Sequence, residues 1–154
     1  MRAAARMSAG GSMITLTFGG STRVMPNYNV MGVAKAALEA SVRYLAADLG
    51  ADDIRVNAIS AGPVRTLAGA GIADARLMYN YQKRNAPLRR TVTIDEIGGA
   101  ALYLLSDLST GVTGDLHFVD SGYNIISMPH PAALQTVDEA QTAAEAHSPK
   151  DAAQ

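Results

Sequence analysis

Residues 13–60 decide the fold, and they open with Met13-Ile14-Thr15-Leu16-Thr17-Phe18. This short apolar run has the length and composition of a buried strand, and Gly19-Gly20-Ser21 ends it. A long helix is predicted from about Tyr28 to Leu49, because small and apolar residues recur there at helical spacing. A second apolar run, Ile54 to Ser60, predicts the next strand.

The rest of the chain continues this alternation. Gly50 is expected to end the first helix, and another helix is predicted around Ala73 to Arg84. A further helix begins after Thr93, which can cap it together with Glu96, and runs to about residue 108. The third strand is expected from Asp115 to Asp120. Strands that alternate with helices favour a parallel sheet with helices on its faces, which is an α/β fold.

The composition of the chain changes at about residue 129. Residues 1–129 contain all the predicted strands, whereas residues 130–154 are rich in Ala, Gln, Asp and Glu. We expect the second segment to be a polar tail that is partly helical or disordered. Three strands are few for such a sheet, and the first of them would have an unpaired edge. The predicted sheet is therefore expected to be part of a larger one.

Charge and composition exclude several classes of function. The 154 residues are 48% apolar and carry a net charge of −1, so there is no basic surface to hold nucleic acid or an anionic membrane. The chain has no cysteine, which excludes disulfides, thiolate catalysis and zinc–sulfur sites. Its three histidines are far apart, so no metal site is expected. There is no apolar run long enough to span a membrane, and we expect a cytoplasmic protein.

Tyr28 and Lys35 are a candidate catalytic pair. They are seven positions apart, which is about two helical turns, or roughly 10 Å along the axis. Both therefore project from one face of the predicted helix, and Lys35 reaches back toward Tyr28. A nearby cation would favour the phenolate and bring the pKa of Tyr28 closer to the range useful in acid–base chemistry. From the pair alone, an ordinary amphipathic helix with a surface lysine is the better interpretation.

The sequence around the pair changes that interpretation. Strand, glycine-serine turn, Pro-Asn-Tyr, helix and strand follow one another in the order found in short-chain dehydrogenases/reductases, which the chain resembles. It is most similar to the enoyl-acyl-carrier-protein reductases of bacterial fatty-acid synthesis, over about residues 12–129. The motifs that carry the resemblance are PNYNVMGVAK (26–35), AKAALEA (34–40), RVNAISAGPVRT (55–66), LRRTVTI (88–94), VTG (112–114) and VDSGY (119–123).

This resemblance implies a fold and an activity. The fold would be the C-terminal half of a Rossmann-type, doubly wound parallel sheet, with residues 1–129 as the catalytic half. The implied reaction is the NADH-dependent reduction of trans-2-enoyl-acyl-carrier-protein by a homotetramer. The sequence shows no first strand followed by a glycine-rich turn and a helix N-terminus, the element that binds the cofactor's pyrophosphate. We therefore expect the isolated chain to be weakly active or inactive.

The resemblance also implies roles for individual residues around the cofactor. Tyr28 would hydrogen-bond the thioester carbonyl of the substrate and stabilise the enolate formed by hydride transfer. Lys35 would bind the nicotinamide ribose and support Tyr28. Gly62-Pro63-Val64 form a turn that would let the backbone approach the nicotinamide amide. Thr66 would contribute a hydroxyl group to the pyrophosphate.

Other residues would contact the acyl chain of the substrate. Phe18, Met78 and Tyr81 are the candidates beside Tyr28, and residues 67–84 correspond to the mobile substrate loop of the family. Many members of the family have tyrosine in place of Phe18, so the preferred acyl length stays open. Plain helix packing is an equally good interpretation of Met78 and Tyr81, and Tyr79 is either a wall of the acyl pocket or a packing residue.

Two alternative functions stay open. The chain could be a non-catalytic interaction module that keeps the association surfaces of the family. It could also belong to a carbonyl reductase of the same superfamily, most of which have a Tyr-x3-Lys pair. Position 32 is glycine, so Tyr28 has no lysine at that spacing. Tyr79 and Lys83 have the spacing but follow the second strand, which is the wrong place.

Overall fold

The computed structural model of the chain describes residues 3–64 and 75–129. Its strands and longer helices alternate along the chain as the sequence predicts. They are β1 (Gly11–Thr17), α1 (Asn29–Leu49), β2 (Ile54–Ala61), α3 (Ala75–Asn85), α4 (Ile94–Leu105) and β3 (Leu116–Val119). Short 3-10 turns are η1 (Ala4–Arg6), η2 (Gly19–Ser21), η3 (Gly50–Asp52), η4 (Asp107–Ser109) and η5 (Tyr123–Ile125). The polar tail predicted for residues 130–154 lies outside the described residues.

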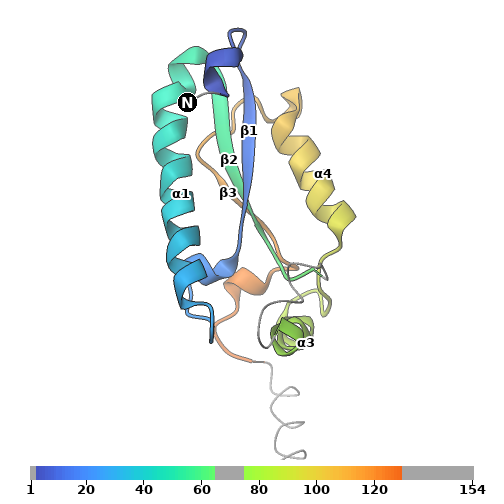
Figure 1. Cartoon of the computed structure of the whole chain (residues 1–154). Coiled ribbons are helices and arrows are strands. Elements are labelled where there is room, and N and C mark those ends of the chain that lie inside the picture. The colour runs from blue at the N-terminus through green and yellow to red at the C-terminus, as the bar shows by residue number, and fades with distance from the viewer. Residues whose placement is uncertain (1–2, 65–74, 130–154) are drawn as a thin grey trace, which may run out of the picture.

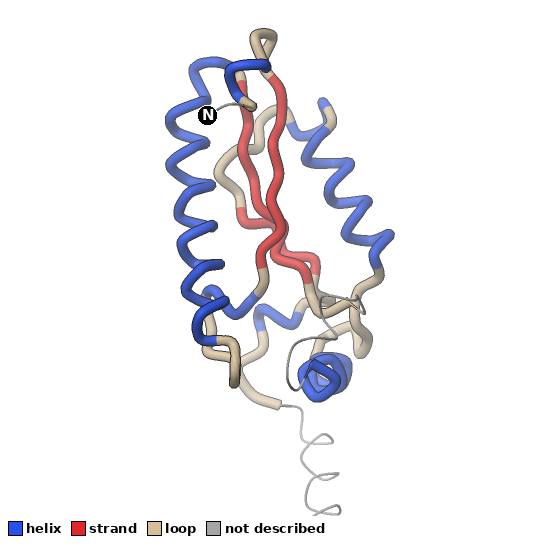
Figure 2. Tube along the Cα trace, in the orientation of Figure 1, coloured by secondary structure: helices blue, strands red, loops and turns tan. Residues whose placement is uncertain are grey.

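The three strands form one parallel sheet in the order β1-β2-β3. Gly11 of β1 pairs with Ile54 of β2, and Ala58 of β2 pairs with Leu116 of β3. Helix α1 covers one face of the sheet and α4 the other, as Figures 1 and 2 show. This confirms the predicted α/β fold with helices on both faces. Within the described residues β1 has a partner strand on one side only, as expected.

The core between α1 and the sheet consists of aliphatic side chains at helical spacing. Val42, Ala46 and Leu49 pack against residues 54–58 of β2 and are almost fully buried. The burial of these chains removes apolar surface from water, and this drives the helix onto the sheet. On the other face Leu104 of α4 is fully buried. The sheet is therefore the middle of three layers.

Two polar side chains of β2 tie the sheet to the last turn of α4 and to the loop before β3. Asn57 is fully buried, and its amide donates to the Val112 carbonyl (2.9 Å) and accepts from the Asp115 N–H (3.0 Å). The Arg55 guanidinium donates to the carbonyl groups of Leu104 (2.9 Å) and Ser106 (3.1 Å). The Leu104 carbonyl also accepts from the hydroxyl groups of Ser12 and Ser109, and the Ser106 carbonyl from that of Ser109. Arg55 is therefore one of several donors that stabilise the C-terminus of α4.

The helix ends differ from the predictions in two places. Helix α1 ends at Leu49 as predicted, but Gly50 is right-handed with φ −63°, and the left-handed residue is Asp53 with φ 57°. The glycine therefore starts a 3-10 turn, and Asp53 makes the reversal. Helix α4 ends at Leu105 and not near residue 108, because Ser106 is extended and its side chain caps a new short turn.

The start of α4 confirms the predicted capping box and gives a pH-dependent contribution to stability. The side chain of Glu96 accepts hydrogen bonds from the Arg90 guanidinium (2.6 and 2.8 Å) and from the Thr93 N–H (2.8 Å). These interactions, that of Arg90 first, lower the pKa of Glu96 from 4.5 to about 2. A carboxyl group whose pKa is lower in the folded protein than in the unfolded one stabilises the folded state at pH values above the unfolded pKa. That stabilisation is lost as the pH falls through the folded pKa.

We therefore expect the free energy of unfolding to fall as the pH is lowered from about 4.5 to about 2. The effect is expected to be small, because both side chains are exposed and salt screens the pair. Urea unfolding across this window measures it, with Glu96→Gln as the variant that has no titrating group at position 96. If the variant and the natural sequence lose the same stability over the window, Glu96 is not the responsible group.

No helix among the described residues is long and apolar enough to cross a membrane. The same residues contain no group of three or more His, Asp or Glu side chains that could hold a metal ion.

Candidate active site

The candidate site lies where the C-terminal ends of the three strands meet. The loops that follow β1 and β3 lie at this edge with the turn after β2, and α3 lies beside them (Figure 1). In open parallel sheets ligands bind outside the carboxyl ends of the strands, so this edge is the expected place for a site.

Tyr28 lies at this carboxyl end of the sheet, at the N-cap position of α1. Its side chain is buried, with 8% exposed, and its ring packs edge-to-face on Phe18, which directly follows β1, at 5.5 Å between centroids. A Cβ atom at Gly20 would lie 2.5 Å from the Tyr28 ring. Phe18 and the backbone of Gly20 therefore hold the ring from two sides.

Glycine at position 32 has a structural reason. A Cβ atom there would lie 2.7 Å from the Gly20 carbonyl oxygen, so only glycine lets the loop after β1 approach the first turn of α1. The Gly32 N–H also donates to the Tyr28 carbonyl (2.6 Å). The sequence showed only that Tyr28 has no lysine at this spacing. In the structure Gly32 also lets the loop after β1 lie close to α1, and so helps to position the Tyr28 ring.

The hydroxyl group of Tyr28 has no hydrogen-bond partner among residues 3–64 and 75–129. Burial raises the pKa of Tyr28 above its usual value of 10.0. The expectation that Lys35 would favour the phenolate is wrong for this structure, because burial determines the shift and Lys35 is not among its causes. At neutral pH Tyr28 is therefore a neutral phenol, able to donate a hydrogen bond.

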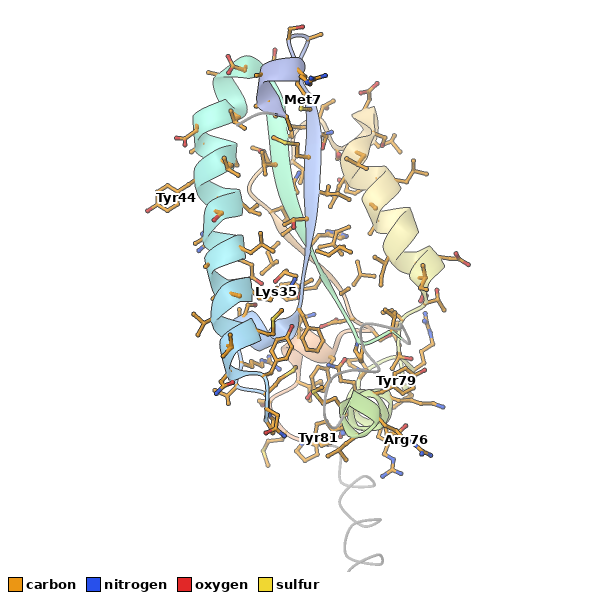
Figure 3. All side chains as sticks on the ribbon, in the orientation of Figure 1. Met7, Lys35, Tyr44, Arg76, Tyr79 and Tyr81 are labelled. Atoms are coloured by element: carbon orange, nitrogen blue, oxygen red, sulfur yellow. The ribbon has the colours of Figure 1, made fainter. Side chains whose placement is uncertain are left out.

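Lys35 points from α1 toward the sheet, whereas Tyr44 on the same helix points away from it (Figure 3). The Lys35 ammonium donates to the Leu16 carbonyl near the end of β1 (2.9 Å). One turn further along α1, the carboxylate of the buried Glu39 accepts from the Thr17 hydroxyl (2.6 Å). These two bonds fasten α1 to the end of β1. An ammonium group has three N–H bonds, so Lys35 keeps donors for a ligand.

The turn after β2 is closely packed. The Gly62 N–H donates to the Val119 carbonyl (2.8 Å), and a Cβ atom at Gly62 would lie 3.1 Å from the Asp120 Cα. The glycine thus lets β2 and β3 end side by side, and Pro63 and Val64 follow it half-buried. Thr66, predicted to contact pyrophosphate, lies outside the described residues.

Helix α3 carries two of the four predicted substrate residues, Met78 and Tyr81. Met78 is half-buried, and Tyr81 is exposed and packs edge-to-face on Tyr123 at 6.3 Å. The hydroxyl of Tyr79 instead accepts from the Thr91 hydroxyl (2.8 Å), so Tyr79 packs toward the loop before α4. Figure 3 shows Tyr79 and Tyr81 on different sides of the helix. Contact of Met78 and Tyr81 with an acyl chain stays a prediction.

The comparison with known proteins decides the family. A family model described as enoyl-(acyl carrier protein) reductase matches residues 1–124. The chain belongs to the enoyl-(acyl carrier protein) reductase family. It is 74% identical over 137 residues to enoyl-(acyl-carrier-protein) reductase (NADH) 2 of Rhizobium meliloti strain 1021, covering 89% of this chain and 51% of that protein. It is 60% identical over 120 residues to the FabI protein of Rickettsia typhi, covering 78% and 46%.

Solved structures of this reductase family share the fold. The FabI structure from Candidatus Liberibacter asiaticus superposes with a TM-score of 0.81 at 62% identity, over 84% of this chain and 50% of that one. The reductase from Anaplasma phagocytophilum, in complex with NAD, gives 0.78 at 54% identity, over 84% and 47%. The chain thus spans about half the length of the relatives it matches.

Sequence reasoning assigned no structural role to several residues at this edge. The Asp120 carboxylate accepts from the Gly122 N–H (2.9 Å) and the Asn124 N–H (2.7 Å), and so shapes the turn after β3. The spacing Asp-x-Gly-x-Asn is a turn signal that could have pointed to it. Tyr123 and Arg23 gave no such local signal, because their partners lie far away in sequence.

Proposed function

We propose that this chain supplies the catalytic half of an NADH-dependent reductase of trans-2-enoyl-acyl-carrier-protein in fatty-acid biosynthesis. The observation that carries the proposal is Tyr28, a buried, protonated phenol whose hydroxyl is unpartnered in the described chain, with Lys35 at the same edge of the sheet. Relatives named as NADH enoyl-(acyl-carrier-protein) reductases, 60–74% identical to this chain, support it.

The residues at this edge fit a nicotinamide cofactor. Lys35 has donors left for the hydroxyl groups of a ribose, and the turn at Gly62-Pro63-Val64 brings main-chain groups to the same edge. We propose that these residues hold the nicotinamide end, and that Thr66 contacts the pyrophosphate. When bound, NADH would supply the hydride for the β-carbon of the substrate.

Tyr28 would act on the carbonyl oxygen of the thioester. Negative charge develops on that oxygen when hydride reaches the β-carbon, and a preorganised donor stabilises it. The raised pKa keeps the phenol protonated and able to donate at neutral pH. Phe18, in contact with the Tyr28 ring, and Met78 and Tyr81 on α3 would line the path of the acyl chain.

We also propose that the working enzyme is a cytoplasmic homotetramer that takes its substrate from acyl-carrier-protein. Exposed apolar side chains on two helices support an oligomer. Val30 and Val33 are exposed on α1, and Leu102 and Leu108 are exposed on or just after α4. Where such side chains form a contiguous patch, they mark an association surface. Analytical ultracentrifugation measures the association state of the chain, and of a protein in which the N-terminal half of the Rhizobium meliloti relative precedes it.

The proposed function is tested by NADH consumption with a trans-2-enoyl thioester. The 154-residue chain is compared with a protein in which the N-terminal half of the Rhizobium meliloti relative precedes it. We expect turnover from the completed protein and little or none from the chain alone. Normal turnover by the chain alone would contradict the expectation that it needs the other half.

A folded but inactive completed protein would contradict the reductase assignment and favour the interaction-module alternative. Reduction of a β-ketoacyl thioester, without reduction of the enoyl thioester, would favour a carbonyl reductase.

A further inference from the structure

Arg23 joins two loops of the candidate site that are about a hundred residues apart in sequence. Its guanidinium group donates to the carbonyl groups of Ile126 (2.6 Å), Tyr123 (3.5 Å) and Asn124. These carbonyls belong to η5 and the residue after it, which follow β3. The two segments lie at the same end of the sheet in Figure 1. Arg23 has no carboxylate partner within the described residues, so these backbone groups are its principal contacts.

The first of the two segments that Arg23 joins is the loop that contains Phe18 and Tyr28. The Arg23 N–H donates to the Gly19 carbonyl (3.1 Å), and the Tyr28 N–H donates to the Met25 carbonyl (3.2 Å). The loop is thus a short hydrogen-bonded unit with Arg23 in its middle and Tyr28 at its end. Because only a few residues separate Arg23 from Tyr28, a displacement of Arg23 is expected to shift the backbone of Tyr28.

The second segment, residues 123–126, packs against α3 through Tyr123. The Asp120 carboxylate fixes the backbone of the turn that contains Tyr123, and the Tyr123 ring packs on Tyr81 of α3. The Leu88 N–H, just beyond α3, donates to the Ser121 carbonyl (3.3 Å). Arg23 thus holds the segment against which α3 packs.

We propose that Arg23 is a positioning residue for the reductase site, which fastens the Tyr28 loop to residues 123–126 and so fixes Tyr28 relative to α3. Part of this inference rests on the proposed function. A guanidinium group is suited to the task because its planar fork directs N–H bonds from separate nitrogen atoms to separate acceptors in a fixed geometry. An ammonium group presents all its N–H bonds from one nitrogen atom.

The anchoring is tested on the 154-residue chain by hydrogen exchange with mass spectrometry. In Arg23→Ala we expect faster exchange in residues 19–28 and 121–128 together, with β2 unchanged. The matched control is Arg6→Ala, an exposed arginine at the opposite end of the sheet (Figure 1), which should leave both segments as they are. Unchanged exchange in either segment of Arg23→Ala would overturn the link.

The positioning role is tested by kinetics in the completed enzyme. We expect Arg23→Ala to lower kcat roughly 10- to 100-fold, as misplacement of a catalytic group does, with the KM for NADH little changed. Millimolar guanidinium should restore part of the kcat, whereas potassium chloride of equal ionic strength should not. Recovery by a small cation separates a lost link from general destabilisation.

The outcomes separate this inference from the proposed function. If the completed natural sequence is inactive, the proposed function fails, and the catalytic part of the inference fails with it. The exchange result still decides whether Arg23 joins the two loops. If the completed enzyme is active and Arg23→Ala keeps its kcat within about twofold, with no recovery by guanidinium, Arg23 is not a positioning residue.

Discussion

Replacing Tyr28 with phenylalanine is expected to lower the kcat of the completed reductase by about 100- to 1,000-fold, the usual cost of removing one donor to a developing oxyanion. The hydroxyl group has no partner in the described chain, so its removal breaks no structural hydrogen bond. The ring contacts with Phe18 and Gly20 persist in phenylalanine. We therefore expect the melting temperature and the KM for NADH to change little, and the loss to lie in kcat.

The control for this substitution is Tyr44→Phe. Tyr44 lies on the same helix, is 74% exposed and points away from the sheet, so its hydroxyl should contribute nothing to turnover (Figure 3). Steady-state rates of NADH oxidation measure both variants. Because the pKa of Tyr28 is raised above 10.0, its donor form should persist through neutral and mildly alkaline pH, and it should not limit kcat there. A kcat of Tyr28→Phe within about twofold of the natural sequence would remove Tyr28 from the mechanism.

The arrangement of strands and helices could be predicted because it depends on local patterns. Short apolar runs ended by glycine gave the strands, and the helical spacing of residues such as Val42 gave α1. The end of α4 could not be predicted, because Leu108 continues the apolar pattern beyond the helix. The extended backbone of Ser106 and its side-chain bond to the next turn decide where the helix stops.

The site could be predicted only where sequence spacing fixes the geometry. Tyr28 and Lys35 fall at one edge of the sheet because the first turns of a helix follow the end of a strand. The pKa of Tyr28 was predicted in the wrong direction, because burial depends on which distant segments close over the ring. The Lys35 bond to Leu16 and the Arg23 bonds to a segment about a hundred residues later in the sequence likewise follow from tertiary packing.

The fit of Gly20 against Tyr28 is a further consequence of packing, and Gly20→Ala should disturb both stability and catalysis. The new Cβ atom would lie 2.5 Å from Tyr28 Cδ1 and 2.7 Å from Cε1, closer than any such contact allows. Either the ring or the loop must move. Overpacking of this kind costs about 1–3 kcal/mol, and a moved ring displaces the hydroxyl group that would bind substrate.

A substitution of the same chemistry elsewhere should have the opposite effect on stability. Gly99 lies inside α4 with nothing within 4 Å of its Cβ position, so Gly99→Ala is expected to stabilise the chain by about 0.5–1 kcal/mol. Urea unfolding compares the two variants, and NADH oxidation by the completed enzyme should fall for Gly20→Ala alone. If Gly20→Ala lowers stability and Gly99→Ala raises it, the Tyr28 ring packs in a space that only glycine at position 20 leaves open. If Gly20→Ala is as stable and as active as the natural sequence, the close approach of Gly20 does not hold the tyrosine, and its position must come from α1 and the contact with Phe18.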